Sequence, residues 1–201
     1  DPLINMDIFT SKQFVVGFWA SNFLYASFMG ITLIVPLFIE NIWGGTALEA
    51  GLVLLPGTIA ALFINPLAGY LTDRFHARPV IVFFGACLAF GSVAMAFMDA
   101  STPFWLILLL QGIRACGVSG LVSPLTSWSM EELAPNRMTD ASSFSTAIRQ
   151  AIASMGTALM VFSITLGAQA FGSLLFGFQL ALGLSGVFAL ALFVIALVRV
   201  R

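Results

Sequence analysis

Residues 69–80 read GYLTDRFHARPV, and the charges of Asp73, Arg74 and Arg78 in this stretch separate two long runs that carry no charge. The run before these residues is uncharged from residue 50 to residue 72, and the run after them from residue 79 to residue 98. A helix needs about 20 apolar residues to cross the hydrocarbon core of a bilayer, and both runs reach that length. The stretch is therefore predicted to be the turn of a helical hairpin whose two arms cross a membrane.

The same pattern extends over the whole chain. Hydrophobic residues make up 60% of the 201 residues and charged residues only 8%, whereas an average soluble domain has roughly 25% charged residues. None of the apolar runs alternates in the way that a membrane β-barrel strand does. The expected fold class is an all-α membrane protein with a bundle of six transmembrane helices over residues 13–198, at about 13–39, 47–71, 79–98, 103–127, 141–171 and 174–198.

The basic residues predict the orientation of these helices, because arginine and lysine gather in cytoplasmic loops. With an inward-facing N-terminus, one side of the membrane holds Lys12, Arg74, Arg78, Arg137, Arg199 and Arg201, and the other holds Glu40, Glu49 and Asp99 and no basic residue. Residues 1–12 are then a cytoplasmic lead-in and residues 199–201 a cytoplasmic tail. We expect a multi-pass protein of the inner or plasma membrane of the cell, embedded in the lipid bilayer with both termini in the cytoplasm.

Several classes of function receive no support from the sequence. The net charge is −1 and there is no basic patch, so nucleic acid is not an expected partner. Cys87 and Cys116 fall inside predicted spans, where a thiol acts as a small apolar side chain, and neither a metal site nor a disulfide nor a cofactor is expected. The chain opens at Asp1 without the pattern of a signal peptide, and we expect it to be one segment of a longer protein.

The turn at residues 69–80 resembles motif A of the major facilitator superfamily, G-x-L-x-D-R-x-x-x-R, although this chain has His76 where that family usually has glycine. The stretches EAGLVLLPGTIAALFINPLAGYLTDR at 49–74 and SSFSTAIRQAIASMGTAL at 142–159 look like the C-terminal halves of fourteen-helix drug:proton antiporters. The resemblance implies two inverted three-helix repeats, which form half of a major facilitator fold. It also implies proton-coupled multidrug efflux by alternating access, a missing N-terminal half, and small amphiphilic or cationic substrates.

Four residues of this turn are candidates for a gating role. Gly69 is expected to let two helices approach closely, and Asp73 to cap or charge-pair at a neighbouring helix end. Arg74 and Arg78 could bind helix carboxyl ends or lipid phosphate. A simpler interpretation is that any cytoplasmic turn collects arginines.

A candidate substrate cavity follows from polar residues inside the predicted spans. Arg114, three residues after Gln111, is predicted near mid-membrane, where a charge costs about 2.5–3.5 kcal/mol on insertion scales and so faces a polar cavity or a partner. The alternative is a structural arginine held by backbone carbonyls or by a carboxylate of the absent half. A second set of candidates recurs at helical spacing and could equally be helix packing: Phe18, Asn22, Tyr25 and Met29.

Arg149 and Gln150 are predicted at the cytoplasmic interface, because a full-length apolar span follows them. There Arg149 would snorkel towards water or pair with Asp140. No Asp or Glu lies within a predicted span. If the coupling ion is a proton, the acid that carries it is therefore expected in the absent half.

Three alternatives stay open at this stage. The sequence GVSG at residues 117–120 matches the G-x-S-G of rhomboid proteases, but that chemistry needs a histidine base. The single histidine, His76, lies in the predicted cytoplasmic turn, so we expect no enzyme and no catalytic residue. The others are a membrane scaffold or sensor domain without transport, and a half-transporter that pairs with a copy of itself.

Overall fold

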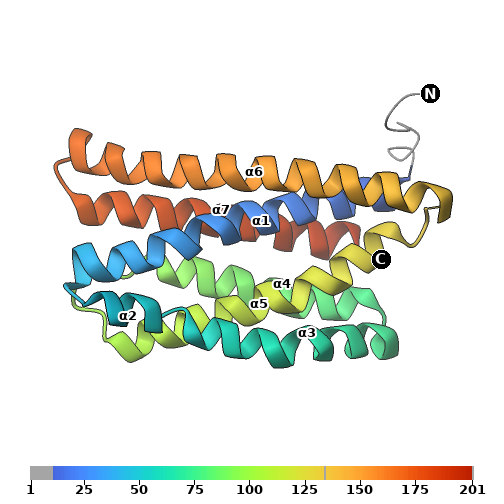
Figure 1. The fold of residues 1–201 in the computed structure, drawn as a ribbon, viewed down its shortest axis with the longest axis horizontal. Coiled ribbons are helices and arrows are strands. Elements are labelled where there is room, and N and C mark those ends of the chain that lie inside the picture. The colour runs from blue at the N-terminus through green and yellow to red at the C-terminus, as the bar shows by residue number, and fades with distance from the viewer. Residues whose placement is uncertain (1–10, 134, 201) are drawn as a thin grey trace.

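The computed structural model describes residues 11–133 and 135–200, and every regular element within them is a helix (Figure 1). Six helical segments are long and apolar enough to cross a membrane, which confirms the predicted number. Helix α1 (Lys12–Phe38) continues into a π-helical turn (Ile39–Trp43), and α2 (Ala47–Leu52) and α3 (Leu55–Phe75) together make the second segment. The others are α4 (Ala77–Met95), α5 (Phe104–Met130), α6 (Pro135–Ala170) and α7 (Leu174–Arg199).

The break between α2 and α3 has a local cause. Pro56 has no backbone N–H, so the carbonyl of Leu52 cannot receive the usual helical hydrogen bond. The chain tightens instead, with the N–H of Leu54 donating to the carbonyl of Gly51 at 3.2 Å. Upstream, Thr46 and Glu49 form a capping box that starts α2. The sequence predicted one kinked span here, and the structure divides it into two helices.

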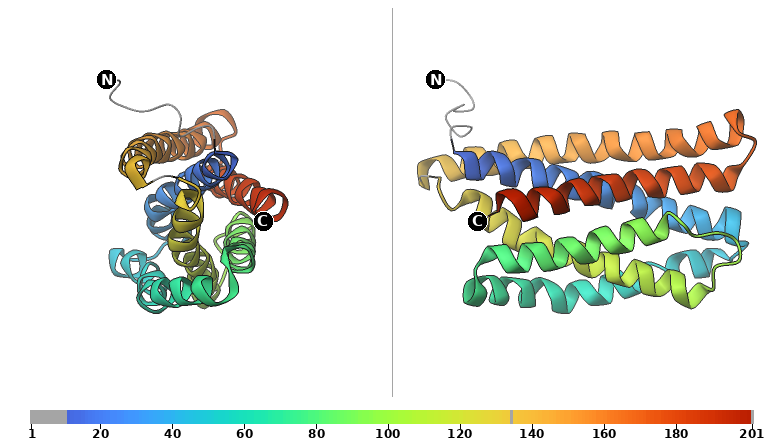
Figure 2. Two further views of the ribbon diagram at one scale, coloured as in Figure 1. Left: turned by 90° about the vertical axis from the view of Figure 1, so that its right-hand side faces the viewer. Right: turned by 180° about the vertical axis from the view of Figure 1, so that it is seen from behind.

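The six segments form two inverted repeats of three helices, with α1, α2–α3 and α4 in the first and α5, α6 and α7 in the second. Helix α1 packs against α6 and α7, and α5 packs against α3 and α4. In the view of Figure 1 helices α6, α1, α5 and α3 form the near face, and Figure 2 shows α7 and α4 on the opposite face. We call the near face the open face.

The basic residues of the loops and helix ends gather at one end of the bundle. The start of α1, the α3–α4 turn, the start of α6 and the end of α7 share one end in Figure 1. That end carries the described basic residues Lys12, Arg74, Arg78 and Arg199, and the segments at the other end carry Glu40, Glu49 and Asp99. The fold therefore brings together the loops that the charge pattern assigned to one side. The side chain of Arg137, residues 1–10 and Arg201 lie outside the described residues.

The tightest helix contact joins α6 to α7. A Cβ placed on Gly167 would overlap the Cα atom of Gly177, and a Cβ on Gly177 would lie 2.5 Å from the carbonyl oxygen of Ile164. Small residues allow membrane helices to pack backbone to backbone, where no difference in hydrophobicity drives helices together. The two glycines thus let the backbones of α6 and α7 meet directly.

Candidate functional site

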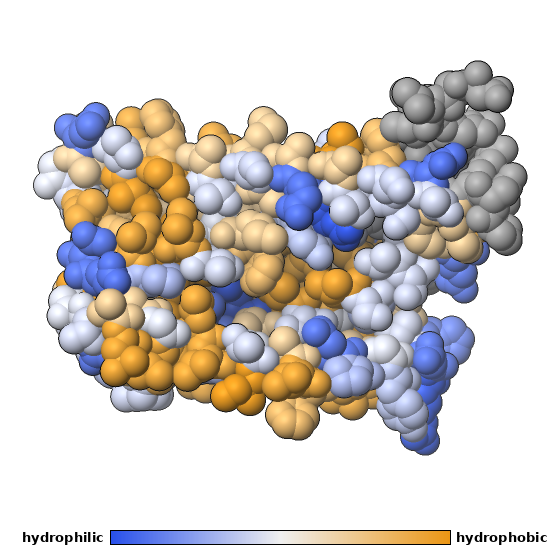
Figure 3. Space-filling view, viewed as in Figure 1, coloured by the Kyte–Doolittle hydropathy of each residue, from blue (hydrophilic) through white to orange (hydrophobic). Residues whose placement is uncertain are grey.

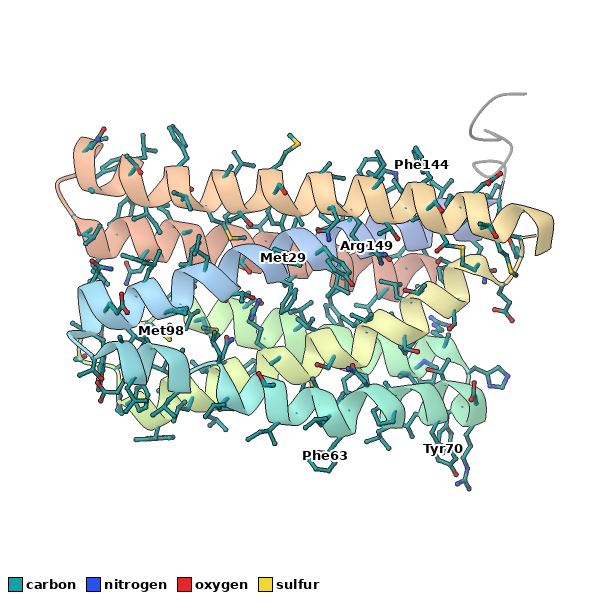
Figure 4. The ribbon with its side chains drawn as sticks, viewed as in Figure 1. Met29, Phe63, Tyr70, Met98, Phe144 and Arg149 are labelled. Atoms are coloured by element: carbon teal, nitrogen blue, oxygen red, sulfur yellow. The ribbon has the colours of Figure 1, made fainter. Side chains whose placement is uncertain are left out.

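Helices α3 and α6 are the parts of the open face that the rest of the bundle covers least. In the most apolar stretch of the segment Ala47–Phe75, which contains α3, only 11% is buried inside the bundle. The value is 22% for the segment Met138–Ala170 of α6 and 56% for the segment Lys12–Trp43 of α1. Phe63 and Tyr70 project from α3 away from the bundle (Figure 4). On this face hydrophilic side chains interrupt the hydrophobic surface along α6 and between α1 and α5 (Figure 3). A surface that met only lipid would not need these polar groups.

A groove of about 680 Å³ runs along α6 on this face. Met29 of α1 and Phe162 of α6 give it apolar walls, and its polar residues are Gln150, Ser154, Thr157 and Thr165. These four polar residues stand four, three and eight positions apart, which places them on one face of a helix. Sequence reasoning named only Gln150 among them, although the spacing was available as a signal. The groove is an amphiphilic surface on the candidate span Met138–Ala170, and the position of Arg149 and Gln150 at the cytoplasmic interface stays a prediction.

Arg149 lies on α6 next to this groove and contacts α1 (Figure 4). Its guanidinium carbon is 4.6 Å from the centre of the Tyr25 ring, and its Nη2 donates to Oγ1 of Thr146 at 3.1 Å. A cation over an aromatic ring is attracted to the ring's electron-rich face. The contacts of Arg149 among the described residues are thus with Tyr25 and Thr146, and its pairing with Asp140 stays a prediction.

Phe18 and Asn22 are buried inside the bundle. Phe18 stacks on Phe144 with 5.8 Å between ring centres. Asn22 is 2% exposed and lines a small pocket of about 20 Å³ together with Ser145 and Arg149. The four candidates on α1 therefore do not share one surface. Met29 lines the α6 groove, Tyr25 lies under Arg149, and the other two lie in the helix interface.

Arg114 is fully buried at the centre of the bundle. Its Nη1 donates to Oε1 of Gln111 at 3.3 Å, and its Nη2 to the carbonyl oxygens of Ser27 and Phe28 at 3.3 and 3.5 Å. No acceptor lies near its Nε. Backbone carbonyls therefore do accept hydrogen bonds from Arg114, as one of the two sequence-based interpretations expected. These carbonyls are neutral, however, and both distances from Nη2 are long for a hydrogen bond.

A second groove, of about 290 Å³, opens beside Arg114 between α1, α3 and α5. Gln111, Arg114 and Ser119 line it from α5, and Thr58 lines it from α3. The six predicted cavity residues therefore fall into three places: Met29 in the α6 groove, Gln111 and Arg114 in this second groove, and the remaining three at the α1–α6 interface. We call this second groove the Arg114 groove.

Two serines that the sequence analysis did not single out form hydrogen bonds next to Arg114. The hydroxyls of Ser27 on α1 and Ser185 on α7 lie 2.8 Å apart, and each donates to the other's backbone carbonyl at 3.1 Å. The carbonyl of Ser27 also accepts from Arg114. These hydrogen bonds join α1, α5 and α7 at one buried point.

The α3–α4 turn is tight in spite of its histidine. His76 has φ 69° and ψ 160°, a region that glycine adopts and other residues rarely enter. It separates α3 from α4 without an intervening loop. The backbone thus keeps the geometry of the glycine that motif A usually has at this position.

The structure separates the predicted roles of the turn residues. Close approach at Gly69 is wrong within this chain, because a Cβ there would meet nothing within 4 Å. Asp73 and Arg78 are exposed and line a hollow of about 710 Å³ together with Glu131 and Glu132. The Nη1 of Arg74 donates to the hydroxyl of Tyr70 at 3.1 Å.

Asp73 forms no hydrogen bond or ion pair with any residue described, so none of these residues is the partner expected at a helix end. Within the described residues, no three His, Cys, Asp or Glu side chains are grouped so that they could hold a metal ion.

The comparison with known families agrees with this arrangement. The family model described as Major Facilitator Superfamily matches residues 17–201, almost the whole chain. The chain belongs to the major facilitator superfamily. Among curated relatives, it is 28% identical over 160 residues to an uncharacterized MFS-type transporter, YhcA, of Bacillus subtilis, a match that covers 80% of this chain and 30% of the relative. It is 25% identical over 164 residues to the multidrug export protein EmrB of Escherichia coli, over 79% of this chain and 31% of EmrB.

The chain thus spans about a third of the length of these curated relatives. A solved structure, that of an auto-inhibited POT family peptide transporter, aligns with a TM-score of 0.72 at 19% identity. The alignment covers 93% of this chain and 37% of that one. The agreement shows that the six-helix bundle has the arrangement of part of a larger transporter fold.

Proposed function

We propose that this chain is the C-terminal six-helix half of a secondary active transporter that exports small amphiphilic compounds by alternating access. In such a transporter the substrate binds near the midplane, between two halves that rock against each other. The observation that carries the proposal is the α6 groove. It combines Phe162 and Met29 with Gln150, Thr157 and other polar groups on a helix face that this chain leaves uncovered.

The other half would cover the open face. The hydroxyls of Ser154 and Thr165 donate to backbone carbonyls of α6, but the side-chain amide of Gln150 has no hydrogen-bond partner among the described residues. A lone bundle would expose this amide to lipid, whereas a second bundle would enclose it in a cavity. The match to about a third of EmrB and YhcA agrees with a larger protein. EmrB is a multidrug export protein, which supports drug-like compounds as the substrate class.

Proton coupling and topology complete the proposal. The spans of this chain contain no Asp or Glu except near their ends, so the acid that binds and releases the coupling proton belongs to the other half. The end that carries Lys12, Arg74, Arg78 and Arg199 faces the cytoplasm. No cofactor takes part, and the chain has no catalytic role of its own.

The test is efflux from vesicles. The complete native protein, reconstituted and given a pH gradient, is expected to export a fluorescent drug, and residues 1–201 alone are not. Drug export by residues 1–201 alone would disprove the assignment of the coupling acid to the other half. A complete protein that exports nothing under a pH gradient or a sodium gradient would refute the transport proposal itself.

Asp73→Asn tests the gating turn in the same assay. Because Asp73 is exposed and without a partner among the described residues, its partner is expected in the other half, and its loss should slow turnover while membrane insertion stays normal. Glu40→Gln removes an exposed carboxylate at the opposite end of the bundle and serves as the control. Equal rates for Asp73→Asn and the unmodified protein would contradict a gating role.

A further inference from the structure

We propose that the Arg114 groove receives an anionic group, a carboxylate or a group of similar size, presented from the open face. The inference rests on the proposed function and deepens it, because it assigns the sign of the charge that this half of the cavity selects. That sign is opposite to the cationic substrates that the family resemblance implied.

The first support is the unmatched charge of Arg114. Its side chain is 0% exposed, and its acceptors are one amide oxygen and two backbone carbonyls, all of them neutral. The sequence places no Asp or Glu in α1 or α5, and the one in α3 is Asp73 at the exposed end of that helix. A buried cation without a counter-charge is costly, and its removal from water is compensated only by a charged partner of good geometry.

The second support is the position of the space beside it. The Arg114 groove holds about 290 Å³ and is lined by α1, α3 and α5, which all lie on the open face. Its other polar atoms are the hydroxyls of Thr32, Thr58 and Ser119 and the amide of Gln111. The hydroxyls of Thr32 and Thr58 donate to the carbonyls of Phe28 and Leu54 at 3.1 and 3.2 Å. The donors left for an anion are the hydroxyl of Ser119, the amide nitrogen of Gln111 and the Nε of Arg114, which has no hydrogen-bond partner among the described residues.

The third support is the rigidity of Arg114. Gly91 of α4 lets that helix pack against the backbone of α5 at this point, since a Cβ there would lie 2.8 Å from Cβ of Arg114. The carbonyl that accepts from Nη2 is itself fixed by Ser185. A guanidinium held in this way is preorganised for a carboxylate and loses little freedom on binding.

The anionic group could come from a substrate or from an acidic side chain of the other half. Both sources would supply the same chemistry at the same place, and a matched pair of probes separates them. The probes are 1-naphthoate and 1-naphthylmethylammonium, which share one ring system and carry opposite charges.

The experiment measures binding of each labelled probe to the complete native protein in nanodiscs, together with its unfolding temperature. If a substrate supplies the anion, 1-naphthoate binds more tightly than the ammonium compound. Arg114→Gln then weakens naphthoate binding by about tenfold or more, the effect of losing a charged hydrogen bond, and leaves binding of the ammonium compound unchanged. Arg114→Lys keeps the charge and restores most of the affinity. Arg199→Gln, which removes an exposed arginine at the end of α7, has no effect.

If an acidic side chain supplies the anion, naphthoate has no advantage over the ammonium compound. Arg114→Gln then lowers the unfolding temperature, and a second change of one acidic residue of the other half to its amide restores it. The proposal is overturned if Arg114→Gln weakens both probes equally, which would mark a packing role. It is also overturned if the substitution changes neither binding nor stability. These readouts do not require transport, so a failure of efflux would refute the proposed function without deciding this point.

Discussion

The strained residue of the α3–α4 turn offers a direct test of the structure. His76 adopts φ 69° and ψ 160°, a combination that is essentially restricted to glycine because a Cβ clashes with the backbone there. Neither neighbouring helix leaves room for a longer loop, since α3 ends at Phe75 and α4 begins at Ala77. His76→Gly should therefore stabilise the protein.

The size of the effect follows from two opposing contributions. A residue held in this region costs on the order of 1–3 kcal/mol, which glycine would release. Glycine also has more freedom in the unfolded chain, which opposes the gain by about 0.4–1 kcal/mol. The expected net stabilisation is about 1–2 kcal/mol. For a chain of this size that corresponds to an increase in unfolding temperature of roughly 2–8 °C.

The assay is thermal unfolding of the purified protein in detergent, with His76→Ala as the matched control. Alanine removes the imidazole but keeps the Cβ, so it should leave the strain in place and the unfolding temperature nearly unchanged. If the alanine and glycine variants rose equally, the imidazole and not the backbone would be the source of the effect. An unfolding temperature for His76→Gly at or below that of the unmodified protein would refute the strained geometry.

Three further predictions concern other parts of the bundle. Gly167→Ala should destabilise the protein by about 1–3 kcal/mol in thermal unfolding, because its Cβ would overlap α7. At Gly183 the nearest atom to an added Cβ is 4.0 Å away, so Gly183→Ala should be tolerated and serves as the control. Equal destabilisation by the two substitutions would contradict the close packing of α6 and α7. Alanine substitutions of Ser27 and Ser185, singly and together, should show a coupling of about 0.6–1.7 kcal/mol in a double-mutant cycle, and additive losses would argue against their mutual hydrogen bonds. Two hydrogen bonds from Ser101 lower the pKa of Asp99, the one from its hydroxyl having the larger effect and the one from its N–H the next. The contribution of these hydrogen bonds to the free energy of unfolding should therefore be complete above the ordinary aspartate pKa and be lost as the pH falls through the lowered pKa. When thermal unfolding is measured down to below about pH 4, the unfolding temperature of Asp99→Asn should fall less than that of the unmodified protein. Identical dependence of the unfolding temperature on pH in the two proteins would refute this contribution.

Much of the site lay beyond the reach of sequence patterns. The stripe of Phe18, Asn22, Tyr25 and Met29 was predicted from helical spacing, but spacing does not say which helix lies against the stripe. Helix α6 covers the first two and presents Arg149 to the third, so only Met29 remains in a groove. The polar residues Ser154, Thr157 and Thr165 showed regular spacing and could have been found, but hydroxyls inside a membrane helix are also satisfied by their own backbone.

The membrane-spanning design itself could be predicted from the 201 residues. The uncharged runs gave the number of helices because unpaired charge is excluded from lipid, and the resemblance of residues 69–80 to motif A agreed with the family shown by the comparison. Tertiary structure alone decided how those helices meet. It placed α3 and α6 on the open face and Arg114 between a serine pair and an open groove. Hydrophobicity fixes only whether a segment enters the bilayer, whereas neighbours inside a bilayer are selected by close packing and hydrogen bonds, which exist only once the helices are assembled.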